Sequence, residues 1–420
     1  MVSHLRASRE RITRDLTWLV SYASIAGSED EVRVQDALVE AWRAEGWSVA
    51  DWDLDVVALA ARPDFPGMEV SRTQGRGALL TWAGTGGGRR LLFNAHTDVV
   101  PPGDPGAWSG DPFTARLEDV QGSARMIGRG TCDMKAGLVA AWEAMRCVRD
   151  AGISLAGDVL LAPVSGEEDG GLGTYALLQH GVRADACVIP EPTDLAIVPA
   201  NGGALTFRLR VPGRATHASR RTEGTSAIEK FVPILDALGR LEARRNAAVD
   251  PVMARWSIAY PLSIGTVHAG DWASTVPDLL LAEGRLGVAL GESVEDARAS
   301  LEEAVAVASA EDPWLRDHPV VVEWWGGQFA SGSTDVQHPL VTWVGEAHRE
   351  RTGELVDIYG APYGSDLRLM SGLGGIPTIQ YGPGDSAAAH APDEWVDIDD
   401  VLTCAEVLAD VIIRSCADPA

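Results

Sequence analysis

The chain has 420 residues and a formal net charge of -25 at neutral pH. This length exceeds what one hydrophobic core usually supports, so we expect two domains. The acidic excess argues against a nucleic-acid partner, because phosphate binding requires a basic face, and a solvated acidic surface is the simpler interpretation.

The five cysteines are odd in number and widely spaced, at positions 132, 147, 187, 404 and 416. They form neither a paired zinc motif nor a disulfide framework, which favours reduced thiols. The first segment lacks the apolar core and cleavage site of a signal peptide, and no stretch is long enough to span a membrane. We therefore expect a cytoplasmic protein with no membrane partner.

The first part of the chain alternates short apolar runs with helical patterns. A capping box, Ser28 to Glu31, predicts a helix that continues to Ala44 and ends at Gly46. Strands are predicted over residues 90–95, 158–163 and 186–190, and helices over 136–148 and 172–179. This order predicts an α/β fold, a mostly parallel sheet flanked by helices.

The pattern changes near Ala204, where LTFRLRVPG alternates apolar and polar residues as a half-exposed strand does. Further strands are predicted over 262–267, 279–290 and 319–325, and helices over 225–244 and 294–310. This set predicts an α+β domain with a four-stranded antiparallel sheet and two helices. After Gly326 the first pattern returns, with helices over 338–351 and 398–414 and a strand over 376–381. We therefore predict a discontinuous domain of residues 1–204 and 327–420, interrupted by an inserted domain of residues 205–326.

Residue types that bind metal ions recur where apolar runs end beside glycine or proline. They are His96, Asp98, Asp133, Glu167, Glu168, Glu191 and His390. Open α/β sheets place their ligands at the loops that follow strand ends. Two histidines and several carboxylates that meet there would form the shell of two divalent ions, which indicates hydrolysis.

Each of these residues alone also fits a structural role. A histidine at a strand end is often simply hydrogen-bonded, and GEEDGG fits an acidic helix start. Asp133 fits a helix cap, and Glu191 fits an exposed loop charge. Their joint occurrence in this order favours a metal site, and the mixed imidazole and carboxylate donors favour zinc, or cobalt or manganese, over magnesium or calcium.

Seven segments together resemble the co-catalytic zinc aminoacylases and exopeptidases, a family that includes acetylornithine deacetylase, succinyl-diaminopimelate desuccinylase, aminoacylase and glutamate carboxypeptidase. The segments are NAHTDVVPPGD, W-x-x-DPF from Trp108, IGRGTCDMKAG, GEEDGG, PEPT, GRATHAS and YGPGDSAAAHAPDE. The resemblance runs from Leu91 to the C-terminus. It implies a zinc-peptidase-like catalytic domain, with the inserted domain as a lid through which a homodimer forms.

The resemblance also implies roles for the metal-type residues. Two divalent ions would be held by His96, Asp133, Glu168, Glu191 and His390. Zinc is the expected metal, with cobalt or manganese as substitutes. Asp133 would bridge the ions, with His96 and Glu191 on the first and Glu168 and His390 on the second. The carboxylate of Asp98 would orient the His96 imidazole, and the Asp133–Met134 peptide bond would be cis. Glu167 would act as general base toward a bridging water.

Candidates outside the metal shell follow from the same resemblance. His217, in GRATHAS, would donate a hydrogen bond to the oxyanion, although the residue alone fits a surface loop. Arg285 would clamp a substrate carboxylate, with an exposed strand charge as the alternative. Gly364, Ser365 and Asp366 would contact the same carboxylate, and His268 is a weaker candidate for the cleft.

The resemblance implies a metal-dependent amidohydrolase that removes an acyl group from an N-acyl amino acid or related amine. Ser274 stands in STVP where many relatives have asparagine, and ANGGA lacks the basic residue of relatives that act on doubly acidic substrates. This disfavours a desuccinylase. The alternatives are a metallo-carboxypeptidase or dipeptidase acting on short peptides, and a non-catalytic binder of amino-acid conjugates, which would need neither Glu167 nor His217.

Overall fold

A computed structural model describes residues 2–120 and 122–417, with side chains from residue 7 onward. The described residues divide into two compact units. The first unit comprises the described parts of Met1–Ala200, Ser333–Tyr359 and Asp366–Ala420, and the second comprises Asn201–Gly332 and Gly360–Ser365. Within the described parts of the chain, no helix has both the length and the apolar character that a membrane crossing requires.

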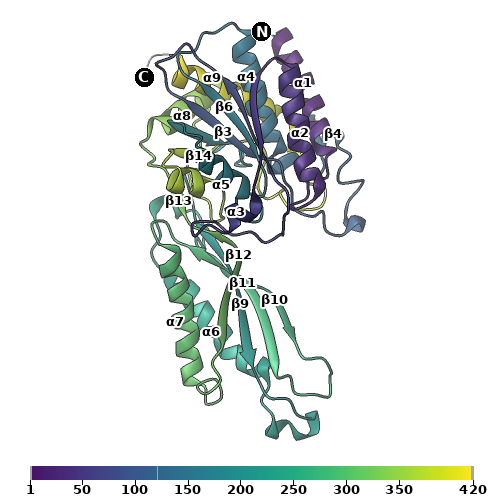
Figure 1. The fold of residues 1–420 in the computed structure, drawn as a ribbon, viewed down its shortest axis with the longest axis vertical. Helices are drawn as coiled ribbons and strands as arrows, with labels where there is room; N and C mark the ends of the chain where they lie inside the picture. Colours follow the sequence, from purple (N-terminus) through teal and green to yellow (C-terminus); the bar gives the residue numbers. More distant parts are fainter. Residues whose placement is uncertain (1, 121, 418–420) are drawn as a thin grey trace. The chain divides into compact units, whose positions relative to one another are not determined.

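A six-stranded, mostly parallel sheet forms the centre of the first unit (Figure 1). In spatial order its strands are β1 (Ser48–Asp53), β2 (Arg76–Trp82), β6 (Val159–Val164), β3 (Leu91–His96), β7 (Ala186–Ile189) and β14 (Thr378–Gln380). The last four are parallel to one another, whereas β1 and β2 pair in antiparallel fashion. This confirms the predicted fold class of this part of the chain.

Helices lie on both sides of this sheet (Figure 1). They are α1 (Val2–Val20), α2 (Glu29–Ala44), α3 (Val56–Ala60), α4 (Ala136–Asp150), α5 (Leu172–Gln179), α8 (Pro339–Thr352) and α9 (Ile398–Cys416). The residues of β3 and β6 are buried along their whole length, as expected of parallel strands covered on both faces. The apolar runs predicted as strands over residues 90–95 and 158–163 are therefore buried strands in the middle of the sheet.

Two local features differ from the sequence-based expectation. The helix after Ser28 begins as predicted, but the Ser28 hydroxyl donates to the Ala23 carbonyl and caps no helix amide. Glu31 accepts from the Gly27 amide and pairs with the buried Arg72, so a tertiary ion pair replaces the predicted capping box. A three-stranded sheet of β4 (Arg116–Val120), β5 (Ser123–Ile127) and β15 (Trp395–Asp397) was not predicted.

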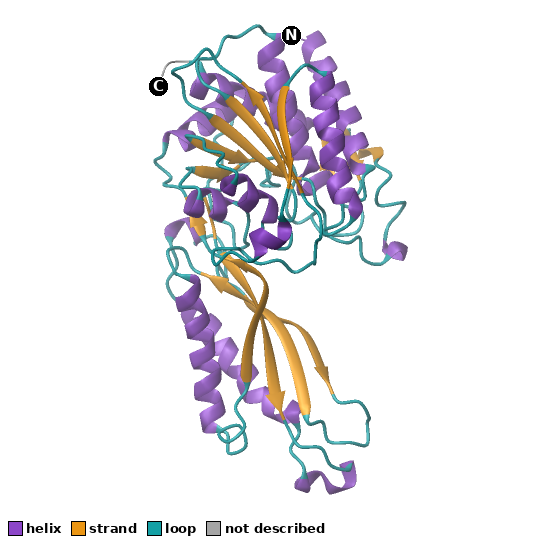
Figure 2. Cartoon of the chain, in the orientation of Figure 1, coloured by secondary structure: helices purple, strands orange, loops and turns teal. Residues whose placement is uncertain are grey.

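The second unit is a four-stranded antiparallel sheet with two helices (Figure 2). The strands, in the order β10 (Leu262–Ala269), β11 (Leu279–Val288), β9 (Gly203–Pro212) and β12 (Val321–Phe329), are accompanied by α6 (Ala227–Arg245) and α7 (Val294–Glu311). Its own core joins Phe207 of β9 to Ile234 of α6 and Leu301 of α7. The predicted α+β architecture is confirmed, and the two-residue strands β8 (Ala200–Asn201) and β13 (Gly332–Ser333) lie where the chain passes between units.

Candidate active site

The ends of three neighbouring strands carry most of the metal-type residues of the first unit. His96 is the last residue of β3, Glu167 and Glu168 follow β6, and Glu191 follows β7. Because β6, β3 and β7 are adjacent and parallel, their carboxyl ends lie at one edge of the sheet. Strand order therefore brings together side chains that lie far apart in the sequence.

Asp133 lies between the two histidines. Its Oδ1 is 3.0 Å from Nε2 of His96, and its Oδ2 is 3.4 Å from Nε2 of His390. Glu191 Oε2 lies 3.8 Å from the same nitrogen of His96, and Glu168 Oε1 lies 3.2 Å from that of His390. The structure thus brings all five predicted ligands together, as two groups that share one carboxylate.

The backbone around Asp133 and His390 departs from regular structure. Asp133 lies in the turn Thr131–Lys135, between Gly130, whose φ is +81°, and the start of α4. The Asp133–Met134 peptide bond is cis, as the resemblance predicted. His390 has a φ of +60°, in the left-handed region that non-glycine residues seldom adopt. Irregular backbone segments, not regular helices or strands, therefore present both side chains.

Asp98 connects the His96 ring to the Glu167–Glu168 turn. Nδ1 of His96 lies 2.9 Å from the carbonyl oxygen of Asp98 and 3.8 Å from its carboxylate. The carboxylate instead accepts hydrogen bonds from the amides of Glu167, at 3.3 Å, and Glu168, at 3.2 Å. Asp98 therefore orients the imidazole through its main chain, and its side chain holds the turn that carries two catalytic candidates.

Charge is concentrated in this site. Burial and the neighbouring Glu191, Asp366 and Glu168 raise the pKa of Glu167 well above its usual value. Burial and the carboxylates of Asp133 and Glu168 likewise raise the pKa of Glu191. Hydrogen bonds to Asp133 and Glu168 raise the pKa of His390 to about 10. Burial and the crowding of like charges therefore disfavour the ionised forms of Glu167 and Glu191.

The donor set fits a pair of divalent cations. One donor atom from each of His96, Asp133 and Glu168 lies within 4.8 Å of the others. Two imidazoles with carboxylates match the ligand preferences of zinc, cobalt and manganese. Two such cations would balance the four carboxylates Asp133, Glu167, Glu168 and Glu191.

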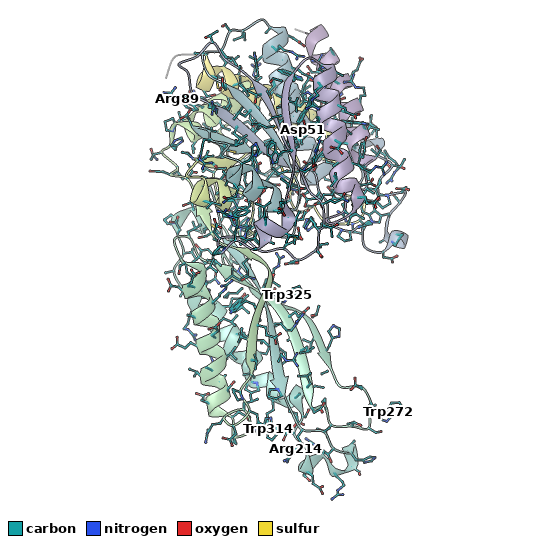
Figure 3. The ribbon with its side chains drawn as sticks, viewed as in Figure 1. Asp51, Arg89, Arg214, Trp272, Trp314 and Trp325 are labelled. Atoms are coloured by element: carbon teal, nitrogen blue, oxygen red, sulfur yellow. The ribbon has the colours of Figure 1, made fainter. Side chains whose placement is uncertain are left out.

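The predicted substrate residues His217, Arg285, Gly364 and Ser365 belong to the second unit. Nδ1 of His217 lies 2.7 Å from Oγ of Ser219, and His217 pairs with Thr275 in an isolated bridge. Trp272, 74% exposed, lies at the tip of the loop before Thr275 (Figure 3). Arg285 is an exposed residue of β11. The roles of these residues toward the first unit's site stay predictions.

Asp366 belongs to the first unit and is buried. Its Oδ2 accepts a hydrogen bond of 2.6 Å from the Thr174 hydroxyl, and its Oδ1 lies 3.9 Å from the Arg368 guanidinium. Arg368 in turn donates to the Gly170 carbonyl at 2.8 Å. Asp366 is therefore linked to the GEEDGG loop through Arg368, and the substrate contact expected of Asp366 stays a prediction.

Four buried charged residues near the site were not singled out from the sequence. Arg129 and Glu394 form an ion pair beside Asp133, and Asp169 pairs with Arg72 beside the Glu167–Glu168 turn. All except Arg72 stand inside segments that carry the family resemblance. Their place inside these segments was the one sign in the sequence that they matter for the site. The sequence does not show which partner neutralises each charged side chain.

Comparison with known proteins agrees with this geometry. The sequence profile of Peptidase family M20/M25/M40 matches residues 92–414. The chain is 29% identical over 359 residues to N-formyl-4-amino-5-aminomethyl-2-methylpyrimidine deformylase of Bacillus subtilis (strain 168), covering 78% of this chain and 79% of that protein. It is 27% identical over 365 residues to acetylornithine deacetylase of Edwardsiella ictaluri (strain 93-146), covering 83% and 85%.

Among solved structures, the dipeptidase Dug1p of Saccharomyces cerevisiae has the same fold, with a TM-score of 0.77, 15% identity and coverage of 100% of this chain and 98% of that one. The match of the family profile to more than three quarters of the chain, including every predicted metal ligand, decides the assignment. The chain belongs to Peptidase family M20/M25/M40 and is a hydrolase that acts on amide bonds.

Proposed function

We propose that this chain is a two-metal deacylase that removes a small acyl group from an N-acyl amino acid or related amine. The observation that carries the proposal is the position of Asp133 between His96 and His390, with Glu191 and Glu168 completing two groups of donors. His96, Asp133 and Glu191 would hold one ion, and Asp133, Glu168 and His390 the other. Zinc fits these donors best, with cobalt or manganese as substitutes.

The proposed chemistry assigns proton transfer to Glu167. When bound, divalent ions lower the pKa of a coordinated water and polarise the carbonyl under attack. Glu167, buried and next in sequence to the ligand Glu168, takes the proton of the attacking water and delivers it to the nitrogen of the leaving amine. Burial raises the pKa of Glu167 above its usual value, which favours this carboxylate as a proton acceptor.

The substrate contacts are proposed for the second unit. His217 donates a hydrogen bond to the oxyanion, and Arg285 pairs with the substrate carboxylate through its planar guanidinium. The main chain of Gly364 and the hydroxyl of Ser365 contact the same carboxylate. We further propose a homodimer through this unit, because Ile228, Val232 and Leu235 form an exposed apolar stripe along α6.

The named relatives support a small acyl group. The two curated relatives named above are a deformylase and a deacetylase, whereas the dipeptidase is 15% identical and supports the fold alone. The test is a hydrolysis screen of N-formyl, N-acetyl, N-succinyl and N-carbamoyl amino acids beside dipeptides, with zinc or cobalt present. We expect turnover of N-formyl or N-acetyl compounds; cleavage of dipeptides alone would contradict the proposal.

A further inference from the structure

A buried ion pair lies directly behind the bridging carboxylate. Nη1 of Arg129 donates to Oε2 of Glu394 at 2.6 Å, and each side chain is 1% exposed. The small three-stranded sheet brings the two together: Arg129 follows β5, Glu394 precedes β15, and Ile127 pairs with Trp395. Neither residue is a predicted metal ligand, and the charged group of each contacts a ligand residue only at that residue's main chain.

Glu394 holds the backbone that carries Asp133. Its Oε1 accepts hydrogen bonds from the amides of Cys132, at 2.8 Å, and Asp133, at 3.0 Å. Its carbonyl oxygen also accepts from the Gly128 amide, at 2.8 Å, and the Thr131 hydroxyl, at 3.1 Å. One residue therefore fixes the turn before the bridging ligand from both its side chain and its main chain.

Arg129 contacts the other loops that line the site. Its Nη2 lies 3.4 Å from the His390 carbonyl oxygen and 3.5 Å from that of Pro101, in the loop after His96 and Asp98. The guanidinium lies 5.1 Å from the centre of the Trp108 ring. The Arg129 amide donates to the Pro112 carbonyl at 2.8 Å. Arg129 therefore connects the loop after His96 and Asp98 with the loop that carries His390.

We infer that Arg129 and Glu394 are a positioning pair that sets the separation of Asp133 and His390, and so the metal affinity of the site. Glu394 anchors the Asp133 backbone, Arg129 anchors the His390 backbone, and their ion pair couples the two anchors. The inference rests on the proposed two-metal site. Groups that orient metal ligands in this way typically change metal affinity or activity by about 10–100-fold when substituted.

The test compares metal binding by three variants with that of the full-length wild-type protein. Glu394→Gln keeps one oxygen for the Cys132 and Asp133 amides but loses the ion pair. Arg129→Lys keeps a positive charge for Glu394 but loses the planar fork that reaches two carbonyls. Asp15→Asn is the matched control, because Asp15 forms a buried ion pair of 2.6 Å with Arg146, between α1 and α4.

Zinc affinity is measured by competition with a chromophoric chelator, and the visible absorption of the cobalt-loaded protein reports ligand geometry. We expect Glu394→Gln to lose about 10–100-fold in zinc affinity with an altered cobalt spectrum. Arg129→Lys should lose less, and Asp15→Asn should match the wild type in both readouts while unfolding at a lower temperature. If Glu394→Gln does not fold, the zinc affinity and cobalt spectrum of Arg129→Lys test the inference.

Wild-type affinity and an unchanged cobalt spectrum in the folded variants would overturn the inference. So would an equal loss of zinc affinity in Asp15→Asn, because the effect would then reflect stability alone. A wild-type protein that binds no zinc or cobalt would instead overturn the proposed function, so the two failures are distinguishable.

Discussion

Oδ2 of Asp133 lies 3.4 Å from Nε2 of His390, although the two residues are on segments widely separated in the sequence. The other oxygen of the same carboxylate lies 3.0 Å from His96. A carboxylate that faces one imidazole with each oxygen has the geometry of a ligand shared by two cations. The proposed two-metal chemistry depends on this arrangement.

Glu167→Gln should retain its metal ions and lose catalytic turnover. The amide cannot accept the proton of the attacking water, and general acid–base catalysis typically contributes about 10²–10⁴-fold. Metal content by mass spectrometry and kcat on an N-acetyl amino acid check this prediction. Glu118→Gln, an exposed carboxylate of β4, is the control and should keep full activity. Near-normal turnover by metal-loaded Glu167→Gln would remove Glu167 from the mechanism.

His217→Ala should lower kcat with little change in KM, because an oxyanion donor acts mainly in the transition state. Loss of one such donor typically costs about 10²–10³-fold in turnover. His318→Ala is the control, because this exposed histidine of the same unit stacks on Trp314 and has no proposed role. A reduction of less than threefold in His217→Ala, or an equal reduction in the control, would argue for a surface loop histidine.

Asp400→Asn should stabilise the protein at neutral pH. Burial and the neighbouring Asp397, Asp194 and Asp399 raise the pKa of Asp400 to about 6, above its usual value of 3.8. The unfolded chain thus ionises Asp400 before the folded protein does, and stability falls as pH rises from about 4 to 6. The asparagine should recover about 1–2 kcal/mol above pH 6, after allowance for solvent screening.

Urea unfolding at pH 3.5 and pH 7.5 measures this difference. The stabilisation by Asp400→Asn should be present at pH 7.5 and small at pH 3.5, where the carboxyl group is protonated in both states. Asp399→Asn, which removes an exposed ion pair with Arg9, should change stability by less than about 1 kcal/mol at either pH. Equal stabilisation by Asp400→Asn at both pH values would rule out an electrostatic cause.

Val232→Glu should convert the proposed dimer into a monomer. The substitution places a charge in the middle of the apolar stripe of α6, where Val232 is 55% exposed. Val307→Glu is a matched control, because Val307 is 54% exposed on α7, outside that stripe. Sedimentation velocity distinguishes the two states. A wild-type protein that sediments as a monomer, or a dimer that persists in Val232→Glu, would contradict dimer formation through α6.

The sequence predicted the elements whose burial produces a strong pattern. The apolar runs of β3 and β6 and the alternation in β9 correspond closely to the observed strands. The predicted ligands also converge, because strand ends in a parallel sheet share an edge. The antiparallel strands β1, β2, β4 and β5 were missed, since most of their residues are partly or fully exposed and their apolar pattern is weak.

The tertiary contacts of charged side chains could not be predicted from local sequence patterns. Glu31 stood in a capping-box pattern, but the buried Arg72 captured its carboxylate, and two hydrogen bonds to a charged partner outweigh one helix cap. Asp98 was predicted to act through its carboxylate, and the imidazole meets its carbonyl instead. Such choices depend on which groups the fold brings within hydrogen-bond distance.

The most direct test is to titrate zinc into chelator-treated protein while following N-acetyl amino acid hydrolysis. The account predicts two zinc equivalents per chain, activity that returns as they bind, and an Asp133→Asn variant that loses both ions and activity. Undiminished hydrolysis in the chelator-treated protein, or an Asp133→Asn variant that binds two equivalents and turns over normally, would contradict it.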